Sequence, residues 1–321
     1  MRTRDSGENY PPTLSQLPVF KICGQDKRQR EEFLQKALTV LDRRGLYGAV
    51  AGKDHLSGYA LSCLARRFDV VFTLQGPDVQ VQTIFLGSGP QAKGQTLCIT
   101  GDGDRALEKF GDELAASLSR LMQAAPLWGC VLIGGRSSRM GRPKHLIRRA
   151  ETGPTWIERA VALLRPEVDG IVVSGAGELP EELENCIRLP DIPGVAGPLT
   201  GIVAATRWHP MASWIFLACD MPLASTPALR WLLENRRAGS WGRVPKLAGA
   251  NRCEPLFALY ERCAGQLFED RLLLGERSIN QIGTHPKIDN PVIPDRFRGC
   301  WKNINTPDQL RQAENHRSES S

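Results

Sequence analysis

Residues 128–144 read WGCVLIGGRSSRMGRPK, and this stretch decides the fold. Its apolar half, WGCVLI, has the composition of a buried strand and leads directly into the glycine pair Gly134-Gly135. Backbone amides that follow such a strand emerge at the edge where parallel α/β sheets bind ligands, and glycines let a phosphate or a base come close. Arg139 and Lys144 add two positive charges that suit a triphosphate. A flexible basic surface loop is the alternative, but the strand, the two glycines and the two basic residues together favour a nucleotide site.

Apolar runs alternate with amphipathic segments over most of the chain. We expect strands at VFKIC, GAVAG, DVVFTLQG, QVQTIFLG, LCIT, WGCVLI, GIVVSG, CIRLPD and WIFLACD. We expect helices at 28–42, 58–67, about 106–122 and about 156–164, a short one at ELPEELEN and another after GPLTG. This alternation predicts parallel α/β sheets. The expected organisation is a disordered tail over 1–17, a smaller α/β domain over 18–126, a second α/β domain over 127–313 and a tail over 314–321, with a linker at about 123–127.

The composition is that of an ordinary folded protein, with 321 residues of which 41% are hydrophobic and 24% charged. It excludes collagen, coiled coils, membrane proteins and secreted miniproteins, and we expect no secretory signal because no apolar run follows the basic N-terminal residues. The net charge of +6 suits small phosphorylated anions, whereas the scattered basic residues predict no binding to nucleic acid. We expect no membrane partner either. The nine cysteines form no CxxC pair, which favours reduced thiols and a cytoplasmic location over disulfides or zinc.

Four motifs, in order, resemble those of one family. VLIGGRSSRMGRPKHL is similar to the nucleotide-binding signature of the molybdenum cofactor guanylyltransferases, usually written LAGGxSxRMGxxK. Residues 191–201 resemble the family's D…GPLAG segment, residues 218–222 its PCDxP and residues 303–310 its NINTPEDL. The resemblance covers residues 128 to about 312.

The resemblance implies an enzyme that transfers GMP from GTP-Mg to the terminal phosphate of molybdopterin and releases pyrophosphate. The implied fold is a Rossmann-like nucleotidyltransferase domain, here preceded by the smaller α/β domain. Matched by motif position, the implied site residues are Leu132, Ile133 and Gly134 for guanine with Gly135 completing the loop, Arg139 and Lys144 for the triphosphate and catalysis, Asp191 for the nucleotide, Asp220 for catalysis and Mg²⁺, and Asn303 and Asn305 for pterin or phosphate. The implied partners are GTP, molybdopterin and the molybdenum or tungsten apo-enzymes that receive the product.

Three positions depart from the family pattern. Ile133 stands where the family has Ala, Pro143 where it often has an acid, and Ser174 where it often has an Asn beside the nucleotide. The expected contact at Ser174 is therefore open.

The two acidic candidates also follow from their own positions. A metal that bridges phosphate oxygens needs one or two carboxylates, and Asp220, at the end of WIFLAC, would project at the same sheet edge as the glycine loop. Asp191 ends CIRLP in the same way. A turn or N-cap acid is the alternative for both, and the stronger one for Asp191. Asn303 and Asn305 precede TPDQ, which has the pattern of a helix capping box, so a structural turn is equally consistent with them. No catalytic base is expected, because the attacking phosphate is already anionic.

The smaller domain lacks the pattern of a phosphate-binding loop. After FKIC a P-loop would read GxxxxGK[ST], whereas the chain has GQDKRQR from Gly24. A near-match at 89–96 has Gln95 in place of the lysine. The order of elements is weakly similar to that of the GTP-binding adaptor protein for molybdopterin-guanine dinucleotide. We therefore expect a degenerate P-loop-like adaptor that acts as a scaffold or docking domain.

Other functions stay open from the sequence. The related molybdopterin cytidylyltransferases typically have LAAG in place of LAGG, so the glycine pair favours guanine. Another nucleotidyltransferase, such as one for sugar phosphates, fits the NINTPDQL ending less well. A catalytically silent chaperone that holds the cofactor is the contrasting class.

Overall fold

The computed structural model describes residues 16–24, 26–52, 57–75, 81–87, 96–100, 103–134, 143–148, 152–195, 197–234, 236–276, 278–306, 308–309 and 311. Internal contacts divide the chain into two compact units. Unit 1 comprises residues 1–125 with 237–239, and unit 2 comprises 126–236 with 240–321. Within the described ranges, no helix is both long enough and apolar enough to cross a membrane.

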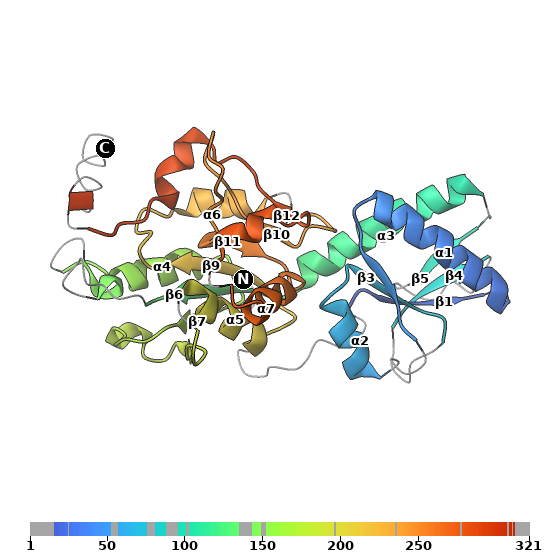
Figure 1. Cartoon of the computed structure of the whole chain (residues 1–321), viewed down its shortest axis with the longest axis horizontal. Coiled ribbons are helices and arrows are strands. Elements are labelled where there is room, and N and C mark those ends of the chain that lie inside the picture. Colours follow the sequence, from blue (N-terminus) through green and yellow to red (C-terminus); the bar gives the residue numbers. More distant parts are fainter. Residues whose placement is uncertain are drawn as a thin grey trace. The chain divides into compact units, whose positions relative to one another are not determined.

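Unit 1 is a five-stranded sheet with helices on both faces, α1 and α3 along one and α2 on the other (Figure 1). The strands are β1 (Val19–Cys23), β2 (Gly48–Val50), β3 (Val70–Thr73), β4 (Gln82–Leu86) and β5 (Thr96–Ile99), and the helices are α1 (Lys27–Arg43), α2 (Gly58–Ala65) and α3 (Asp104–Ala124). The order is β2-β3-β1-β4-β5, and every pairing is parallel. The parallel sheet predicted for this part of the chain is confirmed.

The core of unit 1 lies between the sheet and the α1–α3 face. Phe20 and Phe72 are buried from the strands, and Leu41 and Phe110 from the two helices. Because alternate strand residues point to one face and helix residues repeat every 3.6 positions, these apolar side chains meet in one layer. The packing of amphipathic helices on β-rich apolar runs is what the sequence pattern predicted.

The start of α1 is fixed by a capping box. Asp26 Oδ1 accepts a hydrogen bond from Gln29 N at 2.9 Å, and Gln29 Oε1 accepts one from Asp26 N at 3.3 Å. A cap of this kind satisfies amides that would otherwise be unpaired at the helix start. A side-chain carboxylate therefore lies at the helix N-terminus beyond the central strand β1.

Unit 2 contains a seven-stranded sheet of mixed direction. Its strands are β6 (Leu127–Leu132), β7 (Gly170–Ser174), β8 (Ile187–Leu189), β9 (Ser213–Ala218), β10 (Gly242–Arg243), β11 (Phe257–Tyr260) and β12 (Ile288–Asp289). The order is β12-β10-β11-β9-β6-β7-β8. The strands β8, β7, β6 and β9 are parallel neighbours, with β6 between β7 and β9, which is a Rossmann-like arrangement.

Two features of unit 2 go beyond the sequence expectations, which named no strand after WIFLACD. β11 runs antiparallel to both β9 and β10. Only a loop separates β10 from β11, and a parallel return between them would need a crossover segment. The linker expected at about 123–127 is shorter, since α3 runs to Ala124 and β6 begins at Leu127. Only Ala125 and Pro126 lie between the two elements.

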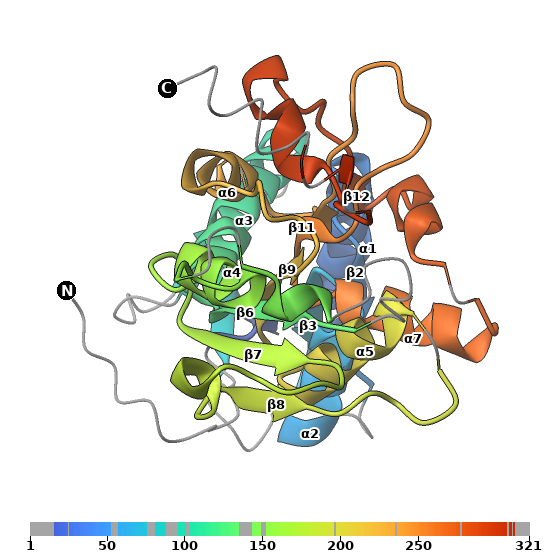
Figure 2. The ribbon, with the colours of Figure 1, turned by 90° about the vertical axis from the view of Figure 1, so that its left-hand side faces the viewer.

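Helices cover both faces of this sheet. They are α4 (Trp156–Leu164), α5 (Pro198–Trp208), α6 (Thr226–Leu233) and α7 (Ala264–Leu273), and the 3-10 turns are η3 (Lys144–Leu146), η4 (Glu181–Leu183), η5 (Asn280–Thr284) and η6 (Asp295–Trp301). Figure 2 shows α4 and α6 on one side of the strands and α5 and α7 on the other. The helix expected at ELPEELEN is only the turn η4, which follows Pro180 and buries Leu183.

One row of residues crosses the four parallel strands at their carboxyl ends. Leu132 on β6 is in register with Ser174 on β7 and with Ala218 on β9. Ser174 is in turn in register with Leu189 on β8. This row marks the edge at which a parallel sheet offers its loops to ligands.

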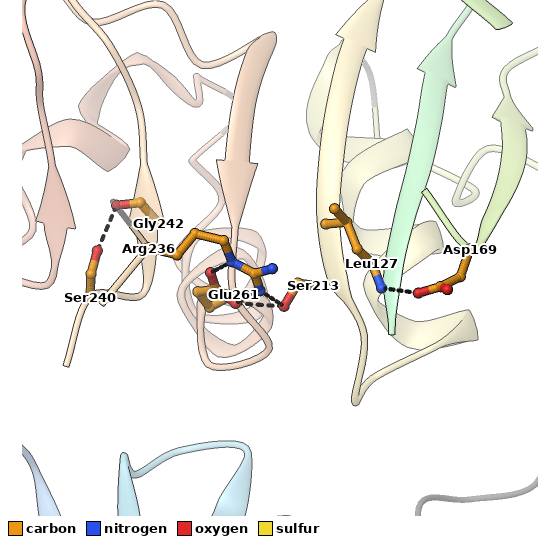
Figure 3. A network of polar contacts seen from close by, with 7 residues as sticks. All are labelled: Leu127, Asp169, Ser213, Arg236, Ser240, Gly242 and Glu261. Carbon is orange, nitrogen blue, oxygen red and sulfur yellow. Dashed lines mark hydrogen bonds and ion pairs between the residues drawn. The ribbon is translucent and has the colours of Figure 1, made fainter. Parts of the chain in front are cut away.

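The opposite, amino edge of the sheet is held by polar side-chain contacts (Figure 3). Arg236 donates to both oxygens of Glu261, at 2.9 Å from Nε and 2.8 Å from Nη2, and Nη2 also reaches Ser213 Oγ at 3.0 Å. Ser213 Oγ donates to Glu261 Oε2 at 2.5 Å, and Leu127 N donates to Asp169 Oδ2 at 2.9 Å. These contacts fix where β6 and β9 begin, and so set the register at their other ends.

Candidate active site

Three of the predicted site residues lie at the same distance beyond the register row. Gly134, Asp191 and Asp220 each follow a row residue by two positions, on β6, β8 and β9 respectively. Because the strands are parallel and in register, this common offset brings all three to one edge of the sheet. Gly134 is exposed with φ +142°, a conformation that L side chains rarely adopt. Gly135 and Arg139 lie outside the described residues.

Lys144 brings two distant segments together at this edge. Its Nζ donates to Asp220 Oδ2 at 3.0 Å and to Asn305 Oδ1 at 2.5 Å. The side chains of Lys144 and Asp220 are only 17% and 20% exposed, so water screens the ion pair less than it would at the surface. Two of the three N–H donors of the Lys144 ammonium group are directed at Asp220 and Asn305, and these bonds hold its charge in one position.

Apolar packing explains why these three groups meet. Ile147 ends the turn that begins at Lys144, and it is buried with Trp156 and Ile304 in one small cluster. Trp156 N donates to Ile147 O at 2.9 Å, and Ile304 N donates to Asp220 O at 2.8 Å. Ile304 immediately precedes Asn305, so the cluster anchors both partners of the ammonium group.

The backbones of the two residues before Gly134 are hydrogen-bonded to neighbouring strands or to the residues that follow them. Leu132 O accepts from Cys219 N at 3.0 Å, and Ile133 N donates to Ser174 O at 2.8 Å. The side chains of Leu132 and Ile133 are 8% and 4% exposed. Ser174 is buried, and its Oγ lies 3.4 Å from Leu189 O. The guanine contacts expected of Leu132 and Ile133 stay predictions, and Gly134 is the exposed member of the three.

The other two predicted binding residues differ in their surroundings. Asp191 is exposed in the loop after β8. That loop is tied to α5, because Ile192 N donates to Thr200 Oγ1 at 2.5 Å. Asn303 is half-buried, and its Oδ1 is a buried acceptor with no hydrogen-bond partner among the residues that the structure describes. An unsatisfied buried carbonyl of this kind is costly, which is consistent with a donor from a bound ligand.

Cys219 is the thiol nearest to this centre. Burial, and next the charge of Asp220, raise the pKa of Cys219 to about 12, although Lys144 opposes the shift. A thiol with so high a pKa is protonated at neutral pH and is a poor nucleophile. The described charged groups of the centre are therefore the ammonium of Lys144 and the carboxylates of Asp220 and Asp191.

Asp220 is the described residue that suits a metal. Within the described part of the chain, no group of three His, Cys, Asp or Glu side chains could hold an ion. Mg²⁺, however, is commonly held by one or two carboxylates and completed by water and phosphate oxygens. The single carboxylate of Asp220, completed by water and phosphate oxygens, fits this way of binding Mg²⁺.

The sequence suggests no function for His145 or for the loop after β7. In the structure His145 is buried beside Lys144, and its Nε2 lies 2.9 Å from Glu178 O. Gly175 and Gly177, at φ +121° and +137°, lie between the strand end and this histidine. The closely spaced glycines in SGAGE were the available sequence signal.

Comparison with known proteins agrees with this geometry. Residues 129–286 match the model of the MobA-like NTP transferase domain. The chain is 34% identical over 197 residues to the molybdenum cofactor guanylyltransferase of Rhizobium meliloti, covering 57% of this chain and 88% of that protein. The chain belongs to the MobA-like nucleotidyltransferase family. It is therefore a nucleotidyltransferase, with a Rossmann-like catalytic domain in unit 2.

Two further proteins are similar to the chain. A probable molybdenum cofactor guanylyltransferase of Pelotomaculum thermopropionicum is 31% identical over 198 residues, covering 58% of this chain and 90% of that protein. The crystal structure of molybdopterin-guanine dinucleotide biosynthesis protein A from Archaeoglobus fulgidus is 27% identical, with a TM-score of 0.48, and covers 60% of this chain and 99% of that one.

Proposed function

We propose that the chain is a molybdenum cofactor guanylyltransferase, which transfers GMP from GTP to the terminal phosphate of molybdopterin. The observation that carries the proposal is the convergence of Lys144, Asp220 and Asn305 at the sheet edge where the strand of Gly134 ends. A fixed ammonium, a carboxylate and an exposed glycine are the groups that a nucleoside triphosphate requires. The names of the relatives specify guanylyl transfer to this cofactor.

The reaction requires positioning and charge neutralisation rather than a covalent enzyme intermediate. A phosphate oxygen of molybdopterin forms a bond to the α-phosphorus of GTP, the bond to the β-phosphate oxygen breaks, and pyrophosphate leaves with the electron pair. Lys144 holds its positive charge against the triphosphate, and Asn305 and Asp220 keep that charge from moving. No side chain has to accept a proton, because the attacking phosphate is anionic.

Asp220 would hold the Mg²⁺ that accompanies GTP. When bound, the ion would neutralise charge on the phosphates. The unsatisfied buried oxygen of Asn303 would accept a hydrogen bond from the pterin, or its amide nitrogen would donate one to the phosphate of the acceptor. Arg139 would add a second positive charge, and molybdenum or tungsten apo-enzymes would receive the product.

Nucleotide preference is the direct test of the proposal. GTP, CTP, ATP and UTP, each with Mg²⁺, are added to the full chain, and the melting temperature is measured. GTP should raise it most, because a ligand that binds only the folded state stabilises that state by mass action. Addition of molybdopterin to the GTP sample should then release pyrophosphate.

Two outcomes would contradict the proposal in different ways. Stabilisation by CTP equal to or above that by GTP would favour the cytidylyltransferase alternative. Stabilisation by GTP and molybdopterin without release of pyrophosphate would favour the chaperone that holds the cofactor.

A further inference from the structure

The segment Gly175–Glu178, which follows β7, contacts the chain just before the glycine loop. A Cβ on Gly175 would come within 1.6 Å of Ile133 O and 2.7 Å of its carbonyl carbon. No side chain fits in that space, so the backbone of Gly175 lies directly against the carbonyl of Ile133. This contact fixes the end of β6 immediately before Gly134.

The same segment contacts the chain just after the glycine loop. A Cβ on Gly177 would lie 2.7 Å from His145 Cε1 and 3.0 Å from Nε2, so the imidazole covers this glycine. His145 Nε2 lies 2.9 Å from Glu178 O. A carbonyl oxygen only accepts, so Nε2 carries a proton and donates to it. His145 is 5% exposed, and its ring is held by both contacts.

The segment itself is held in place from its other side. Arg188 on β8 donates from Nη2 to Gly177 O at 2.6 Å and to Gly175 O at 3.4 Å. Gly175 N lies 3.4 Å from Leu189 O, which continues the β7–β8 pairing. The segment is thereby fixed to the sheet.

The position of His145 also determines that of its neighbour Lys144. Both belong to the three-residue turn η3, which is too short to rotate one residue without the next. His145 anchors the turn to Glu178, and Ile147 anchors it to the cluster with Trp156 and Ile304. Lys144 directly precedes His145, the first of these anchors, and reaches Asp220 and Asn305.

We propose that His145 is a positioning residue for nucleotide binding: with Gly175–Glu178 it sets where Lys144 stands relative to the strand end at Gly134. The proposal rests on the nucleotidyltransferase site proposed above. His145 acts through Lys144 and does not itself touch the nucleotide. In this role the imidazole of His145 contributes only its volume and the N–H that it donates to Glu178 O.

Two replacements separate the donor from the volume of the ring. His145→Phe fills the space without a donor to Glu178 O, whereas His145→Gln offers an amide N–H for the same acceptor. In the full chain, His145→Phe should weaken GTP binding by about fivefold or more, the loss of roughly one buried hydrogen bond, and His145→Gln should restore most of it. His209→Phe, the same replacement at the end of α5, is the control and should leave GTP affinity unchanged.

A double-mutant cycle decides whether His145 acts through Lys144. GTP with Mg²⁺ is titrated into the millimolar range against the wild type, His145→Phe, Lys144→Ala and the double variant, and the melting temperature without ligand is recorded for each. A residue that only positions Lys144 should have an effect of less than about twofold once Lys144 is absent, since coupled sites are not additive. A merely structural histidine would lower affinity by the same factor in both backgrounds.

Each other result overturns part of the argument. Equal losses in both backgrounds, or unchanged GTP affinity in His145→Phe with a lower melting temperature, would make His145 a packing residue. If the wild type binds CTP in preference to GTP, the guanylyl assignment fails, and the same cycle run with CTP still decides the role of His145. If the wild type binds no nucleotide, both proposals fail.

Discussion

Asp220 is the residue whose replacement best separates turnover from folding. Asp220→Asn is isosteric and removes the charge that would hold Mg²⁺ and that now faces Lys144. Pyrophosphate release should fall by about a hundredfold or more, the size seen when a preorganised charge is lost from a catalytic centre. The melting temperature should fall less than when the Arg236–Glu261 pair is broken, because Lys144 keeps its hydrogen bond to Asn305. Wild-type turnover at saturating Mg²⁺ would refute the metal role.

Lys144 should behave differently from Asp220, because its role is to hold the triphosphate. Lys144→Ala removes one charge-assisted contact and should weaken GTP binding by about 1.5–3 kcal/mol. Calorimetric titration of GTP measures this directly. Lys109→Ala is a suitable control, since Lys109 lies on α3 of unit 1 and is exposed. An unchanged GTP affinity in Lys144→Ala would place the triphosphate elsewhere.

At the scale of elements, two arginine–glutamate pairs of the same geometry differ in burial. Arg236–Glu261, at the start of β9, has side chains only 11% and 7% exposed, whereas Arg207–Glu269, between α5 and α7, has side chains 49% and 20% exposed. Breaking the buried pair leaves a desolvated charge without its partner. Half-exposed pairs contribute much less.

Glu261→Gln should therefore lower the free energy of unfolding by about 3–5 kcal/mol, and Glu269→Gln by no more than about 1 kcal/mol. Urea denaturation followed by tryptophan fluorescence measures both, because Trp128 and Trp214 lie on β6 and β9 of this sheet. Equal losses would mean that burial does not govern these pairs.

The sequence predicted the elements whose patterns are long and apolar. β6 and β9 are buried at nearly every position, and the glycine loop and Asp220 directly follow them, so the strands and the acid could be predicted together. β10 has only two residues, Gly242–Arg243, which are too few to show the alternation of apolar and polar residues that predicts a strand. Whether β11 returns antiparallel depends on the path of the chain, which composition does not encode.

The contacts within the site were harder to predict than its residue types. Lys144 and Asn305 are 161 positions apart, and their meeting depends on the buried cluster of Ile147, Trp156 and Ile304. An asparagine before a helix is common for local reasons, so its sequence context could not distinguish a turn from a ligand contact. The contact of His145 could not be predicted from residue types, because its partner is the backbone carbonyl of Glu178, and every residue has such a carbonyl.

At the scale of the whole molecule, unit 1 should fold alone and bind no nucleotide. The N-terminus of α1, where a phosphate would sit, already holds the carboxylate of Asp26. A fragment of residues 1–125 should therefore unfold cooperatively and show no heat of binding with GTP or ATP. Micromolar binding by calorimetry would show that a phosphate site exists after all. Failure to fold would show that the boundary is wrong.

The stability of the molecule should also depend on pH through His209. Burial lowers the pKa of His209 below its ordinary value of about 6.5, so the folded state resists protonation that the unfolded chain accepts. The stabilisation of the neutral form is complete above about pH 6.5 and is lost as pH falls toward the lowered pKa. His209→Phe should flatten this slope in urea unfolding below about pH 6.5. An identical slope in the variant would assign it to other groups.

Insertions and deletions in the gene are constrained by the row that joins Leu189, Ser174, Leu132 and Ala218. Side chains alternate between the faces of a strand, so adding or removing one codon before a row residue turns every later side chain of that strand to the other face. Gly134, Asp191 or Asp220 would then leave the shared edge, and no substitution at the site could bring it back. Viable length changes should instead fall in the connections, for example between β10 and β11, where no strand is displaced. A codon-deletion library across β6, β9 and that connection, selected for activity, tests this. Deletions within β6 and β9 should abolish activity, and deletions in the connection should be tolerated.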